Sequence, residues 1–76
     1  MELELYVREG CSRCKHVAEE LKSLGIDVSV VDIDTPEVTT KARALGIRSV
    51  PVLLKVGTKE MKVGDVSKEE LLKFLG

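Results

Sequence analysis

Hydrophobic and polar residues follow two different periods at the start of the chain. Residues 3–7 alternate between aliphatic and other side chains, and a period of two predicts a β-strand with one buried face. Residues 17–21 instead place apolar side chains at helical spacing. This helix is expected to end near Leu24, because Gly25 suits a left-handed stop and Ile26 supplies the apolar contact that follows it.

A second strand and a second helix are predicted next. Residues 26–33 are rich in β-branched side chains, which favour strands. Thr35 and Pro36 are typical of an N-cap and a first helical position. Gly46 and Ile47 repeat the glycine-isoleucine ending of the first helix. The two helices are therefore expected to end in the same way.

The third strand is predicted from an almost continuous apolar run at residues 50–56. Pro51 fits only near its beginning, because proline cannot donate to a β-ladder. Residues 57–58 then turn the chain into a short strand around residues 61–63. Together these two strands predict a hairpin.

The last helix has the clearest start signal. Ser67 and Glu70 have the spacing of a capping box, while Val66 and Leu71 have that of a hydrophobic staple. The predicted order is thus β-α-β-α-β-β-α, in which a right-handed crossover makes the first two strands parallel. We expect an α/β fold with a four-stranded mixed sheet and three helices on its two faces, in one domain spanning residues 1–76.

Composition excludes several classes of function. The 76-residue chain is 33% charged but has a net charge of −1, and one Tyr and one Phe are its only aromatic residues. A nucleic-acid-binding protein would show a basic face or stacking aromatics, and this sequence indicates neither. The sequence offers neither a signal peptide nor a membrane-spanning run, so we expect a cytoplasmic monomer without membrane contact. The absence of Asn and Gln with many Glu and Lys is a thermophile tendency.

The candidate chemistry lies in a C-x-x-C pair. Cys11 and Cys14 are the two cysteines of the chain and follow the first predicted strand. Cys11 therefore falls at a helix N-terminus near three cations, Arg8, Arg13 and Lys15, which favour a nucleophilic thiolate. In a reducing compartment such a pair is redox-active or metal-binding more often than structural.

The whole pattern resembles the thioredoxin superfamily. The element order, the C-x-x-C pair after the first strand and the Val-Pro at the third strand are those of the minimal thioredoxin fold. Residues 46–54 and 63–68 resemble thioredoxins, whereas residues 6–11 are more similar to glutaredoxins. Ser12 and Arg13 between the cysteines match the usual motif of neither subfamily.

This resemblance implies a reaction and roles for four residues. Cys11 would attack a substrate disulfide, and Cys14 would resolve the mixed disulfide that forms. Pro51, with a cis peptide bond as in the family, would pack beside the cysteines. The Val50 backbone would then be free to pair with an extended substrate or with glutathione.

Implied partners are protein disulfides and an electron donor, either glutathione or a flavin-dependent thioredoxin reductase, with no bound cofactor. Arg8, the Val50 backbone and Asp65 are candidate contacts for glutathione. Arg8 is equally readable as a surface cation and Asp65 as a turn residue. We favour a general protein-disulfide reductase, with a glutathione-dependent glutaredoxin as the alternative.

A metal-binding function is the more distant alternative. C-x-x-C also occurs in zinc half-sites and in heavy-metal-associated domains of similar size. Those domains follow their first helix with two strands, whereas residues 35–46 are predicted here to be helical. His16 is interpreted as a solvated helical residue rather than a ligand or base.

Overall fold

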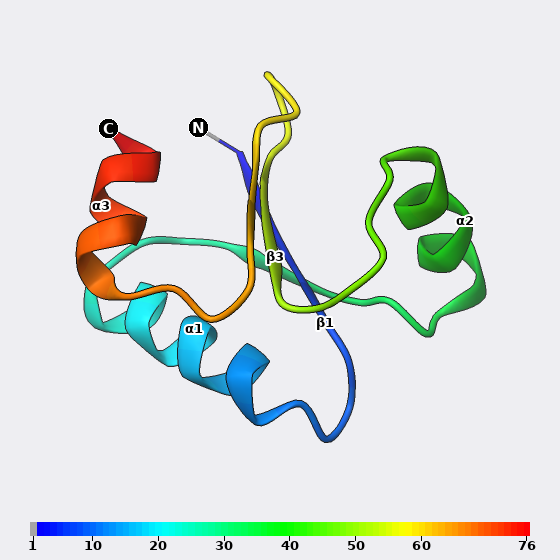
Figure 1. Ribbon diagram of the computed structural model, residues 1–76, viewed down its shortest axis with the longest axis horizontal. Coiled ribbons are helices and arrows are strands. Elements are labelled where there is room, and N and C mark those ends of the chain that lie inside the picture. Colours follow the sequence, from blue (N-terminus) through cyan, green and yellow to red (C-terminus); the bar gives the residue numbers. More distant parts are fainter. Residues whose placement is uncertain (1) are drawn as a thin grey trace.

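The structure is a computed structural model that describes residues 2–76. Within that range the helices and strands follow one another in the predicted order (Figure 1). They are β1 (Leu3–Val7), α1 (Ser12–Ser23), β2 (Ser29–Asp32), α2 (Pro36–Ala44), β3 (Val52–Lys55), β4 (Met61–Val63) and α3 (Lys68–Leu75).

Across the part of the chain that the structure describes, the strands form one four-stranded sheet in the order β2-β1-β3-β4. Strand β1 runs parallel to β2 and antiparallel to β3, and β3 pairs antiparallel with β4. A crossover through α1 produces the parallel pair, while the short connection after β3 produces the hairpin. This mixed sheet is that of the minimal thioredoxin fold, so the predicted fold class is confirmed.

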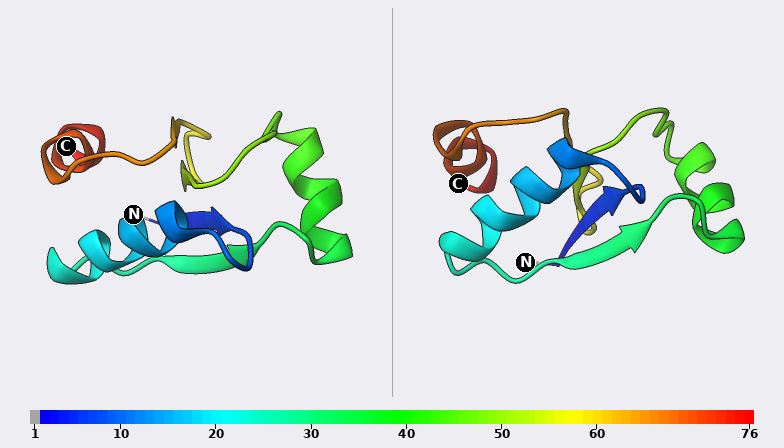
Figure 2. Two further views of the ribbon diagram at one scale, coloured as in Figure 1. Left: turned by 60° about the horizontal axis from the view of Figure 1, so that its bottom comes forward. Right: turned by 90° about the horizontal axis from the view of Figure 1, so that it is seen from below.

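Helices cover both faces of the sheet, with α1 and α3 on one side and α2 on the other (Figure 1 and Figure 2). Leu5 of β1 packs with Leu21 of α1 and Leu71 of α3, and all three are fully buried. On the other face Tyr6 of β1 is buried with Ala42 of α2. Successive strand residues point to opposite faces. Two neighbouring residues of β1 therefore contribute to two different cores.

Both long connections begin with the predicted glycine-isoleucine ending. Gly25 and Gly46 have φ angles of 70° and 79°. The next residues, Ile26 and Ile47, donate their N–H groups back to the last turns of α1 and α2 at 3.0 and 2.9 Å. Because the Ile26 N–H is used in this way, the second strand begins only at Ser29. The predicted start of that strand at residue 26 is wrong.

The third strand is shorter than the predicted range of residues 50–56. Pro51 precedes the ladder of β3, and its carbonyl accepts the N–H of Gly64 at 2.9 Å. After β3 the left-handed residue of the hairpin loop is Lys59, with φ of 64°. The hairpin itself is confirmed. The hydrogen bond between the Gly64 N–H and the Pro51 carbonyl brings the loop before α3 next to the loop before β3.

The capping box predicted for α3 is confirmed. The Ser67 Oγ accepts the N–H of Glu70 at 3.3 Å, and the Glu70 carboxylate accepts the N–H of Ser67 at 3.4 Å. The latter bond is the main reason why the pKa of Glu70 is lowered. Val66 and Leu71 on either side of the cap are buried in the core. These contacts fix the entry to α3 and with it the position of Asp65.

Candidate active site

The two cysteines lie between the end of β1 and the first turn of α1. Gly10 has a φ of 80°, which allows a tight turn, and the N–H of Cys11 donates to the Arg8 carbonyl at 3.2 Å. Cys11 has an extended backbone and is the N-cap residue of α1. A disulfide joins Cys11 to Cys14, and their Cα atoms are 5.3 Å apart.

The sulfur of Cys11 acts as the helix cap. Its Sγ accepts a hydrogen bond from the backbone N–H of Cys14 at 3.1 Å, in the place usually taken by a side-chain oxygen. The sulfur thus lies at the positive end of the helix dipole. Cys14 is only 3% exposed, whereas Cys11 is partly exposed. The first cysteine is therefore the more accessible member of the pair.

A groove with a volume of about 470 Å³ opens beside the disulfide. Its apolar wall includes Val30, an exposed residue of the edge strand β2. The groove is lined by Val7, Arg8, Gly10, Cys11, Ser12, Cys14, Lys15, Ala18 and Val30. Since two of these side chains are cationic and exposed, the groove combines apolar side chains with positive charge.

Arg8 lies in this groove but is bound by a carboxylate. Its Nε is 3.0 Å from Asp34 Oδ2 and its Nη2 is 3.2 Å from Asp34 Oδ1. Both side chains are more than half exposed. The hydrogen bond from the Ile33 N–H to the Val7 carbonyl, at 2.9 Å, carries the chain after β2 along the end of β1. This places the loop carboxylate opposite Arg8.

The Val50-Pro51 peptide bond is cis, so that prediction is confirmed. Pro51 is buried and Val50 is half-buried. Among residues 2–76, the backbone groups of Val50 take part in none of the hydrogen bonds of the turns and loops. They are therefore available to an extended ligand.

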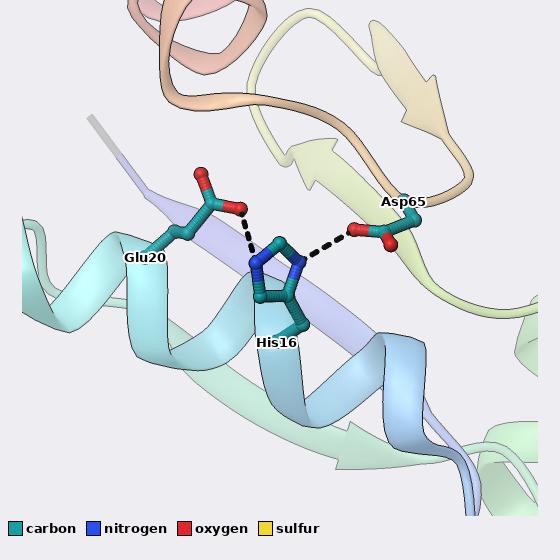
Figure 3. Close-up of side chains that lie close together, drawn as sticks. All are labelled: His16, Glu20 and Asp65. Carbon is teal, nitrogen blue, oxygen red and sulfur yellow. Dashed lines mark hydrogen bonds and ion pairs between the residues drawn. The ribbon is translucent and has the colours of Figure 1, made fainter.

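Asp65 is bonded to the helix that carries the cysteines. The imidazole of His16 lies between two carboxylates, with Nδ1 2.8 Å from Asp65 Oδ1 and Nε2 3.1 Å from Glu20 Oε1 (Figure 3). The hydrogen bond with Asp65 is the main reason why the pKa of His16 is raised, and the charges of Glu20 and Glu19 act in the same direction. The side chain is 56% exposed, as expected for a solvated histidine, but both ring nitrogens have acidic partners.

This cluster is better described as a histidine bridge between two carboxylates than as a metal site. The three potential ligand atoms lie within 4.8 Å of one another. However, Asp65 and Glu20 face opposite ring nitrogens of His16 (Figure 3). One metal ion would need both carboxylates at the same nitrogen, because each nitrogen directs its lone pair along a different line.

The structure brings together several residues singled out in the sequence. Arg8, Cys11 and Cys14 line one groove. Asp65 is joined through His16 to α1. The sequence pattern does not predict the partners of Arg8 and Asp65. The i,i+4 spacing of His16 and Glu20 was a visible signal, whereas the partners of Arg8 and Asp65 lie 26 and 49 residues away.

Comparison with known families shows to which family the chain belongs. The family model described as "Glutaredoxin-like domain (DUF836)" matches residues 2–76. The chain belongs to this glutaredoxin-like family. The glutaredoxin-like protein NrdH of Escherichia coli K12 is 29% identical over 55 residues, which cover 71% of this chain and 68% of that protein.

Solved structures of related proteins share the fold. The NrdH-redoxin of Escherichia coli superposes with a TM-score of 0.80 at 23% identity, covering 100% of this chain and 96% of that one. A glutaredoxin from Archaeoglobus fulgidus has a TM-score of 0.77 at 30% identity, with coverage of 97% and 85%. Thioredoxin 1 of Thermosipho africanus has a TM-score of 0.70 at 20% identity, with coverage of 99% and 90%.

Membership of the glutaredoxin-like family identifies this chain as a redox protein of the thiol–disulfide oxidoreductase type, with Cys11 and Cys14 at disulfide distance. The fold also differs from that of heavy-metal-associated domains, because α2 lies between β2 and β3. Within residues 2–76, no helix combines the length and apolar character needed to cross a membrane.

Proposed function

We propose that this protein reduces disulfides in other proteins, with Cys11 as the nucleophile and Cys14 as the resolving thiol. The observation that carries this assignment is the asymmetry of the pair. Cys11 is the partly exposed N-cap of α1, and Cys14 is buried one turn inside the helix. A helix N-terminus stabilises a thiolate, which is the attacking species.

In the first step the Cys11 thiolate attacks one sulfur of the substrate disulfide. A bond forms between Cys11 and that sulfur, the substrate S–S bond breaks, and the released thiolate takes a proton from solvent. The N–H of Cys14, which donates to the Cys11 sulfur in the structure, holds the nucleophile in place.

In the second step the Cys14 thiolate attacks the sulfur of Cys11. The bond between Cys11 and the substrate breaks, the second substrate thiolate leaves and is protonated, and the Cys11–Cys14 disulfide forms. The substrate has then gained two electrons and two protons. The Cα separation of 5.3 Å between the two cysteines lies within the range for a disulfide, so this closure needs no large rearrangement.

Substrate docking uses the groove and the loop before β3. The free backbone groups of Val50 pair with an extended segment of the substrate, next to the buried Pro51. The apolar wall of the groove near Val30 accepts side chains that flank the substrate disulfide. Backbone pairing and apolar contacts suit many sequences, as a general reductase requires.

The dithiol is regenerated by an external donor, for which we favour a flavin-dependent thioredoxin reductase. The protein acts as a cytoplasmic monomer and binds no cofactor of its own. A cytoplasmic location matches the need to keep the pair reduced between cycles.

The deciding experiment is insulin reduction by the pure protein with each electron source in turn. We expect turnover with dithiothreitol, and turnover with NADPH and a thioredoxin reductase. A Cys11→Ser variant serves as the inactive control. Absence of insulin reduction with every donor, despite a reducible Cys11–Cys14 disulfide, would contradict the proposed function.

A glutathione-dependent glutaredoxin is the second candidate. It is favoured by the position of Arg8 in the groove beside Cys11 and by the 30% identity to the Archaeoglobus fulgidus glutaredoxin. Fast, saturable turnover with NADPH, glutathione and glutathione reductase would support this candidate over the first.

A further inference from the structure

The two parts of the proposed active site belong to different segments of the chain. The cysteines lie at the start of α1, whereas Val50 lies in the loop before β3. A substrate disulfide must reach Cys11 while the backbone beside it pairs with Val50, and catalysis depends on holding such groups in the correct relative position. The placement of this loop relative to α1 therefore affects how well a protein substrate docks.

The loop before β3 is tied to the loop before α3. The N–H of Gly64 donates to the carbonyl of Pro51 at 2.9 Å, and Pro51 directly follows Val50 in the chain. Gly64 has a φ of 93°, a backbone conformation that residues with a side chain rarely adopt. Any contact that holds Gly64 in place therefore also restrains the backbone of Val50.

The histidine bridge joins the loop before α3 to α1. Asp65 directly follows Gly64, and its Oδ1 is 2.8 Å from Nδ1 of His16 (Figure 3). His16 lies two residues after Cys14 in the same helix. Its Nε2 is 3.1 Å from the carboxylate of Glu20, whose side chain is only 10% exposed, so the ring is held in place from within α1. A connected path thus runs from the helix of the cysteines to the loop before β3.

The bridge lies outside the packed core of the α1 side. The side chains of His16 and Asp65 are both partly exposed, and bonds between such groups contribute little to stability. Val66 and Leu71, which follow Asp65, are buried in the core and already hold α3 against the sheet and α1. The main effect of the bridge is therefore to fix the residues just before Val66.

We propose that His16 and Asp65 are positioning residues that hold the loop before β3 in a fixed place relative to the cysteines. This inference rests on the proposed reduction of protein disulfides, in which that loop docks an extended segment of the substrate. Without the bridge, Cys11 keeps its contact with the N–H of Cys14 and with it the reactivity of its sulfur. The loss is therefore expected in the docking of protein substrates and not in the thiol chemistry.

The test compares His16→Ala, Asp65→Ala and the double variant with the unmodified protein. The first readout is KM and kcat for insulin reduction with dithiothreitol as the donor. The second is the rate at which the reduced protein reacts with dithiodipyridine, a small disulfide that has no peptide backbone to dock. The third is hydrogen exchange of the Gly64 amide, followed by NMR in the disulfide form. Glu69→Ala is the matched control, since it also removes a carboxylate near the start of α3.

We expect the KM for insulin to rise about three- to fivefold in each single variant, as suits an exposed charged pair, while kcat changes by less than about twofold. The double variant should match the single variants, because all three remove the same contact. Exchange of the Gly64 amide should speed up more than that of the β3 amides, which report global unfolding. The rate with dithiodipyridine, and all values for the control, should be unchanged.

An unchanged insulin KM in the double variant, with the thermal midpoint preserved, would overturn the inference. Equal acceleration of exchange at Gly64 and in β3 would do the same, because the bridge would then act only on global stability. A slower reaction with dithiodipyridine would also contradict it, since the defect would then lie in the thiol chemistry. Failure of the proposed function is seen in the unmodified protein, as absent insulin reduction. Failure of this inference is seen in the variants, and hydrogen exchange reveals it without any substrate.

Discussion

The backbone N–H of Cys14 donates to the Sγ of Cys11, so the sulfur of one cysteine caps the helix that carries the other. A charged acceptor binds such a donor more strongly than a neutral one. Once the disulfide is reduced, the same N–H therefore favours the thiolate of Cys11. The reactivity of the pair and the start of α1 thus depend on a common contact.

Replacing each cysteine separately should give two different defects. Cys11→Ser should abolish insulin reduction, because the attacking sulfur is lost, while serine still caps the helix. Cys14→Ser should accumulate a mixed disulfide with the substrate, detectable by mass spectrometry, because the resolving thiol is gone. Equal rates of iodoacetamide labelling of both thiols at about pH 6 would argue against this division of labour.

The capping role of position 11 can be separated from its redox role. Neither Cys11→Ser nor Cys11→Ala forms the disulfide, so their comparison isolates the cap. Cys11→Ala should lower the free energy of unfolding by about 1 kcal/mol relative to Cys11→Ser, measured by urea denaturation under reducing conditions. Ser12→Ala in the Cys11→Ser protein is the control and should change this free energy by only a few tenths of a kcal/mol, since it lies inside α1. Equal stability of the serine and alanine variants would show that the cap contributes nothing.

The histidine bridge should make stability depend on pH. His16 faces Asp65, Glu20 and Glu19, and its pKa is raised in the folded protein. Its stabilising contribution is therefore complete below about pH 6.5, the unfolded value, and is lost as the pH rises through the raised folded value. In urea denaturation, His16→Gln should destabilise the protein more at about pH 5.5 than at about pH 9.

A control variant distinguishes this effect from a general change of charge. Lys22→Gln removes a cation at the last turn of α1 that takes no part in the bridge, and its effect should be the same at the two pH values. In addition, NMR titration should find the pKa of His16 closer to its ordinary value in Asp65→Asn. The same destabilisation of His16→Gln at both pH values would contradict the bridge.

A buried hydroxyl on the α2 side of the sheet offers a test of packing. Tyr6 is fully buried, and its hydroxyl donates to Glu4 Oε1 at 3.0 Å. Lys41 holds the same carboxylate at 3.0 and 3.1 Å. Tyr6→Phe should cost about 1 kcal/mol of unfolding free energy, and Glu4→Ala about 2 kcal/mol, since it leaves the hydroxyl without its partner. Calorimetry checks the order of the two effects, and the reverse order would refute the explanation.

Helix caps and helix endings could be predicted from the sequence, because they form between neighbouring residues. The capping box of Ser67 and Glu70 and the endings at Gly25 and Gly46 each depend on a few consecutive positions, and all are found in the structure. The start of the second strand was misplaced because the N–H of Ile26 is used by the helix end. A run of β-branched residues predicts a strand, but it does not show that the helix end uses the N–H of the first residue in the run.

The features that the sequence could not predict are contacts between distant segments. Arg8 and Asp65 were singled out as candidate ligand contacts, but their partners Asp34 and His16 were not recognised as such. Each pair depends on strand register and on the path of a loop, which no local pattern determines. The cis bond at Pro51 was predicted from the family resemblance rather than from the residues alone.

The pairing of β1 with β3 has a consequence for how the chain reaches its native state. Leu5 and Leu53 are opposite each other in the centre of the sheet, yet they come from opposite halves of the chain. Closing so long a loop costs conformational entropy before the buried contacts compensate for it. Neither half can complete a core alone, so we expect the meeting of the first and third strands to limit the rate of folding.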